Sequence, residues 1–521
     1  MNRYFLTFAT ALVHGLMLCH PSTACAANVT PKNILFIYVE DLGYYTSERA
    51  TREPNSRIAG LHTPHLDKLA ASSVNFTRAF CGQSVCSPSK SAIYSGLLPH
   101  INGIWRNCHN NHPKLGNPDQ WIPLPDPITK ENDPTNLAAG GMHAGIPNFI
   151  QALKAKGIYC ALSGKLHQQP ARNFPYDAFV PTTDLNAVIK DAGDKPWFFW
   201  CNPGDTHAPW WKHVQGKLIN PKDRNSAPND VDPAAIQMLP WLPDTPASRI
   251  DLAQYYSCVQ NIDAFVGDML KKLEVSGQAA NTIVVFTGDH GIPVARGKTS
   301  VYPAGTHVPC YIKGPGIKTG RTLSTPISQM DLNPTFLEAF GITPQPVCHG
   351  KSLWPILSGK SDALPDRSTI MTETNHGMSS APKALKPTKA RAVYDGHFYY
   401  IGNVYQDTFK GPVEQAISIG SGSGEYGDPG QQYGIDLHDE AIRHKADQTL
   451  PYELLRQLCM ADAPREELYD LDADPWAVKS LINDAAHAKT LARLRNEFIQ
   501  WRTFTKDNDE PFTVRSGKVA K

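Results

Sequence analysis

The chain has 521 residues, of which 41% are hydrophobic, and a chain of this size can bury one large core and a smaller one. Its formal net charge is +1 and it contains no basic tract, which argues against a nucleic-acid partner. The eleven cysteines are irregularly spaced, without a CxxC pair, so the sequence does not support a zinc site, and any disulfide connectivity stays open.

Residues 1–26 have the features of a secretory signal. A short basic start precedes the mostly apolar stretch Tyr4–Cys19, and Ala24–Ala26 offers a small-residue cleavage site. The apolar stretch is too short for a membrane anchor and is interrupted by His14, and no later segment is long enough to cross a bilayer. We therefore expect an exported protein, periplasmic or secreted, without a membrane span.

Four short runs are apolar throughout and end in polar, titratable residues. The runs are 33–39, 158–162, 197–200 and 282–286. Continuous apolar runs favour strands of a parallel sheet that is covered on both faces, and ligands bind beyond the carboxyl ends of such strands. The residues that follow the runs are Glu40 and Asp41, Lys165 and His167, His207, and Asp289 and His290. We expect them to share one functional edge.

Helical segments are expected between these strands. Residues 63–71 begin with a Thr-Pro pair that suits an N-cap and a first turn, and 146–156 and 249–273 show helical spacing of apolar residues. Two segments rich in Pro, Asn and Asp, 110–140 and 205–245, are expected to form long loops at the active site.

The sequence divides into residues 30–365 and 366–521. Beyond the division, 391–401 has a hairpin pattern with Asp-Gly at its centre, and an amphipathic helix is expected near 485–504. These elements predict a smaller α+β subdomain with an antiparallel sheet.

The pentapeptide Cys86–Lys90 (Cys-Ser-Pro-Ser-Lys) places a thiol where a helix is expected to begin. Pro88 suits the first helical position, with a helix continuing to Leu97 across Gly96. A helix N-terminus favours anions, so Cys86 would face a site for sulfate or phosphate. The alternative is a small buried cysteine beside a turn.

With its flanks Phe80–Cys86 and Ile93–His100, this stretch resembles the signature of the type I sulfatases. In that family the pattern is Cys-x-Pro-x-Arg, and the cysteine is oxidised to formylglycine by a formylglycine-generating or anaerobic sulfatase-maturating enzyme. Lys90 stands where the family has arginine and lacks its bidentate fork.

The resemblance extends over about residues 32–505 and includes Met330–Leu337 and Glu467–Pro475. It implies an α/β, alkaline-phosphatase-like fold: a large mixed, mainly parallel sheet sandwiched by helices, with a smaller C-terminal α+β subdomain.

The clustered carboxylates predict a cation. Glu40, Asp41 and Asp289 would repel one another unless a cation neutralised them, and hard oxygen ligands favour Ca²⁺ or Mg²⁺. The alternative is that these acids only cap helices. The resemblance supplies the ligand set, one divalent cation, Ca²⁺ or alternatively Mg²⁺, at Glu40, Asp41, Cys86, Asp289 and His290. Glu40 replaces the first aspartate of the family pattern.

The resemblance also implies roles for the basic residues, which would otherwise be ordinary solvated loop residues. Lys165 and His167 match a Gly-Lys-x-His element, His207 matches the second histidine, and Lys298 matches the cation that grips sulfate from the far side. His100 and His307 are weaker candidates, with supporting roles.

The implied mechanism starts with in-line attack on sulfur by the hydrated formylglycine at position 86, oriented by Lys90 and His167. Lys165 and Lys298 offset charge on the sulfuryl oxygens, and His207 protonates the leaving group.

Within the family, the chain looks most similar to the heparan N-sulfatases. The stretches Leu242–Ala253, Gly291–Pro293 and Thr374–His376 carry this resemblance. It implies a sulfated saccharide substrate, a terminal N-sulfated glucosamine, with Asn375 and His376 on the sugar side of the pocket. Three alternatives stay open: an O-sulfatase on another polysaccharide, a phosphoester or phosphonate hydrolase, and an inactive sulfated-glycan binder. The oligomeric state is also open.

Overall fold

The computed structural model describes residues 33–46, 61–105, 107–108, 141–143, 145–207, 210, 231–294, 296–364, 367–375, 390–403, 449, 453–454 and 464–507. The expected signal at 1–26, the loop at 110–140, much of the loop at 205–245, and His376 lie outside the described residues.

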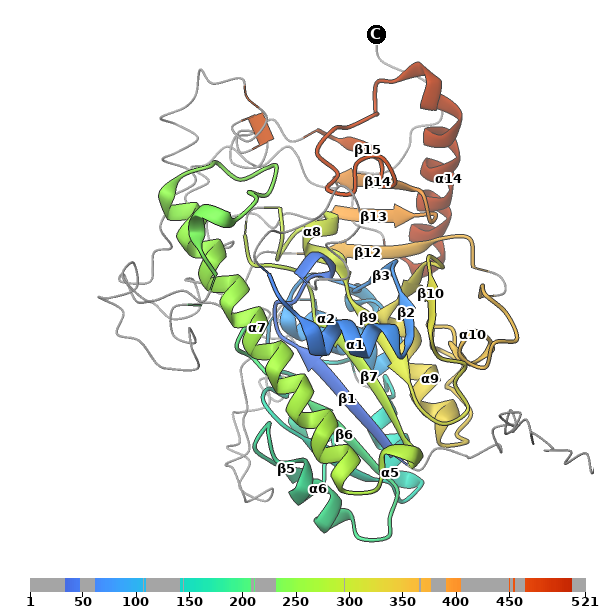
Figure 1. Ribbon diagram of the computed structural model, residues 1–521. Helices are drawn as coiled ribbons and strands as arrows, with labels where there is room; N and C mark the ends of the chain where they lie inside the picture. Colours follow the sequence, from blue (N-terminus) through green and yellow to red (C-terminus); the bar gives the residue numbers. More distant parts are fainter. Residues whose placement is uncertain are drawn as a thin grey trace, which may run out of the picture.

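The large sheet has eight strands in the order β10-β2-β9-β7-β1-β6-β4-β5 (Figure 1). Their bounds are β1 Asn33–Val39, β2 Val74–Phe76, β4 Tyr159–Leu162, β5 Ala178–Phe179, β6 Trp197–Cys201, β7 Thr282–Gly288, β9 Cys310–Lys313 and β10 Arg321–Leu323. The four strands predicted from apolar runs, β7, β1, β6 and β4, are adjacent and parallel. Strand β9 is antiparallel to β2 and β7, so the sheet is mixed and mainly parallel, as predicted.

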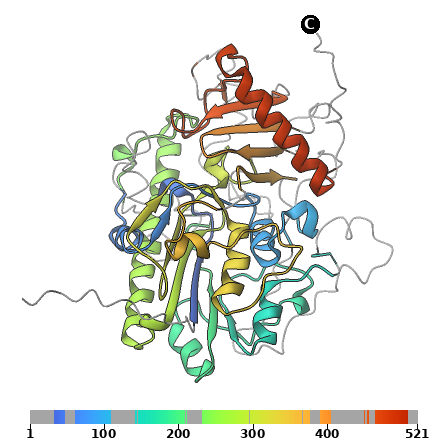
Figure 2. The same ribbon diagram turned by 90° about the vertical axis from the view of Figure 1, so that its right-hand side faces the viewer.

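Helices cover both faces of this sheet (Figures 1 and 2). Along β1, Leu35 and Ile37 pack into one hydrophobic cluster, whereas Ile34 and Phe36 pack into the other. The first cluster includes α1 Pro64–Ala71, α6 Leu185–Ala192 and α7 Pro246–Val275, and the second includes α2 Cys86–Ser95, α5 Phe149–Ala155, α9 Leu332–Ala339 and α10 Trp354–Leu357. This double burial explains why the strands are apolar at every position.

Capping residues set helix bounds that apolar spacing missed. Helix α5 begins at Phe149, three residues later than expected, because Asn148 and Gln151 form a reciprocal capping box. Helix α7 begins at Pro246, three residues earlier than expected, because the Thr245 side chain accepts a hydrogen bond from Ser248 N. In the described residues, no helix combines the length and hydropathy needed to cross a bilayer.

The C-terminal part forms a four-stranded antiparallel sheet, β12-β13-β14-β15, which confirms the predicted α+β layer and the hairpin around Asp395-Gly396. The strands are β12 Ile370–Thr374, β13 Ala390–Tyr394, β14 Phe398–Asn403 and β15 Glu466–Asp470. Helix α14, Ala488–Thr505, packs on one face of this sheet (Figure 2). Phe80 and Val301 of the main part pack with its residues in another cluster. The division at residue 365 stays a prediction.

A third, small sheet and several short helices complete the described elements. They are β3 Ala79–Phe80, β8 His307–Val308 and β11 Ile327–Ser328; α3 Pro99–Asn102 and α8 Pro303–Thr306; and 3-10 turns at Tyr44–Thr46, Ala171–Asn173, Pro233–Ala235, Ala279–Asn281, Gln329–Asp331 and Ala485–His487. The eight cysteines in the described segments are all free thiols.

Candidate active site

Helix α2 carries Cys86 in its first turn. The helix begins at Cys86 itself, with Val85 as N-cap, and it ends at Gly96, which has a left-handed φ of 69°. The expectation that Pro88 is the first helical residue and that the helix crosses Gly96 was wrong. Pro88 is the third residue, where an absent N–H still costs no intrahelical bond, and Gly96 closes the helix because glycine accepts this backbone conformation. Cys86 therefore lies at the positive end of the helix.

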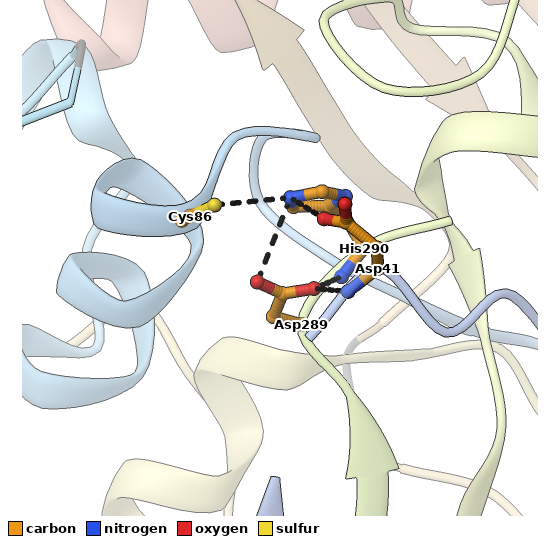
Figure 3. Close-up of side chains that lie close together, drawn as sticks. All are labelled: Asp41, Cys86, Asp289 and His290. Carbon is orange, nitrogen blue, oxygen red and sulfur yellow. Dashed lines mark hydrogen bonds and ion pairs between the residues drawn. The ribbon is translucent and has the colours of Figure 1, made fainter. Parts of the chain in front are cut away.

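The acids predicted at the strand ends meet Cys86 at one edge of the large sheet (Figure 3). Ligand atoms of Asp41, Cys86, Asp289 and His290 all lie within 4.8 Å of one another, and all four residues are buried. His290 Nε2 is 3.3 Å from Asp41 Oδ1, 3.5 Å from Asp289 Oδ2 and 3.6 Å from Cys86 Sγ. Four of the five residues predicted to hold a cation thus come together.

Glu40, the fifth predicted ligand, lies in a second group with Cys86 and His207. Its carboxylate forms ion pairs with Lys90 and, at 3.1 Å, with Lys165. Burial alone would raise the pKa of Glu40, but Lys165 and Lys90 hold it well below its usual range. The two positions at which the sequence departs from the family pattern, Glu40 and Lys90, are therefore in direct contact.

The predicted basic residues surround the thiol. Burial alone would raise the pKa of Cys86, but the charge of Lys298 and hydrogen bonds with His167, His207 and His290 hold it well below its usual range. These surroundings stabilise negative charge at position 86.

Two residues of the site have left-handed backbones. Asp41 has a φ of 54° and His167 a φ of 51°, a region that non-glycine residues seldom occupy. Asp41 N donates to Asp289 Oδ1 at 2.7 Å, and Lys298 Nζ lies 3.0 and 3.3 Å from the two oxygens of Asp41. The Asp41 backbone is thus held by Asp289 and its carboxylate by Lys298, and these contacts stabilise the unusual conformation.

The acidic group fits a hard divalent cation. Asp289 Oδ2 is buried and accepts no hydrogen bond from the described residues. Burial raises the pKa of Asp289 to about 8 with a contribution from the Glu40 carboxylate, although the His290 charge opposes the shift. A bound cation would relieve this excess of negative charge, and carboxylate oxygens are the ligands that Ca²⁺ and Mg²⁺ prefer.

Three supporting residues were missed by sequence reasoning. Ser89 Oγ donates to Asp289 O at 2.6 Å, Gln168 Nε2 donates to Ser87 O at 2.8 Å, and Asn202 Nδ2 donates to Tyr38 O at 2.6 Å. Ser89 lies within the Cys86–Lys90 pentapeptide, Gln168 directly follows His167, and Asn202 directly follows β6, so nearness to these recognised stretches was the available signal.

Asn375, predicted to contact the sugar, is buried near helix α2, which carries Cys86. Its side-chain nitrogen donates to Gln83 Oε1 at 3.0 Å and to Glu373 Oε1 at 2.7 Å. Gln83 precedes Cys86 by three positions, so Asn375 is close to the site, but this nitrogen is engaged within the protein. Its predicted partner His376 lies outside the described residues.

The two weaker histidine candidates have other contacts. His307 stacks between Tyr44 and Phe80, with ring centroids 4.1 and 4.7 Å away, and His100 Nδ1 lies 2.5 Å from Glu373 Oε2. None of these partners belongs to the groups around Cys86.

Comparison with known proteins agrees with this geometry. The sulfatase family matches residues 32–342. The chain is 26% identical to human N-sulphoglucosamine sulphohydrolase over 94% of both chains, and 26% identical to an ulvan-active sulfatase of Formosa agariphila over 91% of this chain and 75% of that protein. A solved 2-O GAG sulfatase shares the fold, with a TM-score of 0.59 and 18% identity over 94% of this chain and 95% of that one. The fold is thus alkaline-phosphatase-like, and the chain belongs to the sulfatase family of sulfuric ester hydrolases.

Proposed function

We propose that this sulfatase removes sulfate groups from a sulfated carbohydrate through a formylglycine nucleophile derived from Cys86. The observation that carries the proposal is the position of Cys86, in the first turn of a buried helix among His167, His207 and Lys298. A hydrated formylglycine supplies the attacking hydroxyl, and a formylglycine-generating or anaerobic sulfatase-maturating enzyme is its required partner.

The surrounding residues orient and neutralise the reacting groups. Lys90 and His167 orient the nucleophile, while Lys165 and Lys298 offset the charge that develops on the sulfuryl oxygens. His207 donates a proton to the leaving nitrogen or oxygen. It lies with Glu40 and Cys86, outside the group proposed to hold the cation, so its ring is not needed as a metal ligand.

One divalent cation, Ca²⁺ or alternatively Mg²⁺, is proposed at Asp41, Cys86, Asp289 and His290, with Glu40 as a further ligand. When bound, the cation supplies Lewis acidity next to position 86. The buried, hydrogen-bond-free Asp289 Oδ2 supports this assignment.

The proposed substrate is a terminal N-sulfated glucosamine of heparan sulfate or heparin, with Asn375 and His376 on its sugar side. Similarity to human N-sulphoglucosamine sulphohydrolase along nearly the whole of both chains supports this choice. Equal identity to an ulvan-active sulfatase supports a second candidate, an O-sulfated polysaccharide. We also propose that the protein is exported to the periplasm or secreted, on the basis of residues 1–26.

The test is to produce the full chain with a maturating enzyme and to measure two quantities. Mass spectrometry of the peptide containing Cys86 should show the aldehyde, and sulfate release should be fastest from N-sulfoglucosamine. A panel of O-sulfated saccharides, an aryl sulfate and an aryl phosphate provides the comparison, with Cys86→Ala as the inactive control.

Each alternative has its own outcome. Sulfate release from O-sulfated saccharides alone would overturn the N-sulfate assignment, and faster turnover of the aryl phosphate would indicate a phosphoester hydrolase. Saccharide binding without release, by protein with an unmodified Cys86, would indicate a glycan-binding protein.

A further inference from the structure

The segment that carries Lys298 is held in an unfavourable backbone conformation. Arg296 has a φ of 59° and Thr299 a φ of 71°, so left-handed residues lie on both sides of Lys298. Between them, a Cβ added at Gly297 would lie 2.0 Å from Ile292 O. Left-handed non-glycine residues cost about 1–3 kcal/mol each and persist only where the surroundings impose them.

Some of these restraints come from neighbouring backbone. Lys298 N donates to Ile292 O at 2.9 Å, and Thr299 N donates to Ser84 O, close to the nucleophile, at 2.8 Å. Ser300 Oγ lies 2.7 Å from the carbonyl oxygens of both Arg296 and Gly297. The bonds of Lys298 N and Ser300 Oγ close the loop on itself, and the bond of Thr299 N ties it to Ser84, but none of them holds the Arg296 side chain.

The Arg296 side chain anchors the loop to the C-terminal part of the chain. It is 4% exposed, its Nη2 donates to Ala477 O, and its guanidinium carbon lies 3.6 Å from the centroid of the Tyr302 ring. Ala477 is fully buried and is itself left-handed, with a φ of 53°. One contact thus joins two strained residues that are 181 positions apart.

A buried carboxylate of β15 completes the anchor. Glu467 is 1% exposed, and its two oxygens lie 3.0 and 2.9 Å from the Tyr302 hydroxyl. It also accepts hydrogen bonds from Tyr469 and, at 2.9 Å, from Asn403. Glu467 opens the stretch Glu467–Pro475, to which the site around Cys86 gives no role. The hydrogen bonds from the Tyr302 hydroxyl to the Glu467 carboxylate fix the Tyr302 ring under the Arg296 guanidinium.

We propose that Arg296 is a positioning residue for sulfate binding: anchored by Ala477, Tyr302 and Glu467, it holds the loop that brings Lys298 to the site. The proposal rests on the role that the proposed function gives to Lys298, which is to bind the sulfuryl oxygens. It assigns the C-terminal part of the chain a role in sulfate binding, because this part supplies Ala477 and, from strand β15, Glu467. Arg296 itself acts only through Lys298.

The test is a double-variant cycle on sulfate affinity in the matured full-length protein, with inorganic sulfate titrated calorimetrically. Lys298→Ala should weaken binding at least about tenfold, a loss of about 1.4 kcal/mol. Arg296→Met should weaken it similarly, and adding it to Lys298→Ala should cost less than about a further twofold, because the two changes remove one effect. Arg296→Lys, which keeps the charge over Tyr302, should recover part of the loss.

Arg78→Met is the matched control. Arg78 also joins the main part to the C-terminal part, through an ion pair of 2.8 Å with Asp472, but Asp472 is 55% exposed. Sulfate affinity should be unchanged in this variant. If Arg296→Met does not fold, Glu467→Gln tests the same anchor with little change in volume and should weaken sulfate binding severalfold.

Three outcomes would overturn the proposal. The first is a wild-type sulfate affinity in Arg296→Met or Glu467→Gln, even with a lower melting temperature, and the second is a loss in the double variant equal to the sum of the single losses. The third is an unchanged affinity in Lys298→Ala, which would also remove the role of Lys298 from the proposed function. Absence of formylglycine alone would contradict the proposed nucleophile but leave this cycle intact.

Discussion

Two regions of the molecule bury charges at high density, and they balance these charges differently. At the junction with the C-terminal sheet, the fully buried Arg391 binds both oxygens of Asp507, at 2.9 and 3.1 Å, and donates to Thr374 O at 3.0 Å. Glu373, also fully buried, pairs with His100 and lies 3.8 Å from Arg391. Positive neighbours lower the pKa of both Glu373 and Asp507 although burial opposes the shift.

At the active edge, the edge of the large sheet that holds Glu40, Asp41 and Asp289 beside Cys86, the buried charges are not all paired in this way. There the pKa of Glu40 is lowered by two lysines, whereas burial raises that of Asp289 to about 8, and Asp289 Oδ2 accepts no hydrogen bond from the described residues. Adjacent carboxylates whose pKa values move in opposite directions are typical of sites that await a ligand or perform proton transfer. The charges of the junction are thus paired within the fold, whereas those beside Cys86 suit the cation and the sulfate of the proposed function.

Asp289→Asn should give the largest effect, because it removes a ligand from the unbalanced side. We expect the bound divalent cation, measured by atomic emission on the purified protein, to be lost. Turnover should fall by more than about 10⁴-fold, as when one member of a catalytic unit is removed.

Asp263→Asn is the control for this prediction. Asp263 is a buried carboxylate of α7, away from the site, and accepts a hydrogen bond from Leu66 N at 2.7 Å. Its variant should retain the cation. Equal cation content in both variants would contradict the assignment of Asp289.

At the balanced junction, Arg391→Met should instead lower stability. It leaves Glu373 and Asp507 buried with fewer positive partners, and removing one partner of a buried ion pair costs about 3–5 kcal/mol. Denaturant unfolding measures the loss. Arg493→Met, at a side chain that pairs with Asp395 but is itself 47% exposed, should cost less than about 1 kcal/mol. Similar losses in the two variants would show that the junction is not a specially stabilised network.

The contrast between these regions also separates what the sequence predicts from what it does not. The strand ends were predictable because each apolar run and the acid or histidine after it are adjacent in the chain, as at Val39 and Glu40. The junction was not, because Arg391 and Asp507 are 116 positions apart and neither belongs to a periodic pattern.

The same limit applies inside the site. The sequence identified Glu40 and Lys90 as departures from the family pattern, but not their contact, because 50 positions separate them. The predicted start of helix α2 was two residues late, because proline is most favoured at the first helical position but is also accepted at the third.

The Glu40–Lys90 contact gives a prediction of intermediate size. Both side chains are almost fully buried, so Lys90→Arg alone should overfill the site and Glu40→Asp alone should leave a gap, each costing about 1–3 kcal/mol in unfolding free energy. The double variant should recover at least about 1 kcal/mol, because the shorter acid makes room for the longer base. Strictly additive losses would show that the two positions are independent.

The smallest expected effect is a change in the pH dependence of stability at Glu373→Gln. In the folded protein, His100 and Arg391 hold the pKa of Glu373 below its ordinary value of 4.5, although burial opposes them. Below pH 4.5 the unfolded chain therefore binds a proton that the folded chain resists, and stability falls as pH decreases through the folded-state pKa.

Above pH 4.5 the stabilisation from this ionised group is fully present, so only the acid limb should change. Thermal unfolding between about pH 3 and pH 6 should show a shallower acid limb in Glu373→Gln than in the wild type, with a difference on the order of 1 kcal/mol. Glu274→Gln, at a side chain that is 70% exposed, should leave the slope unchanged. If Glu373→Gln and the wild type lose stability in parallel on acidification, the junction charge is not what sets their acid sensitivity, and the contrast with the active edge would then rest on geometry alone.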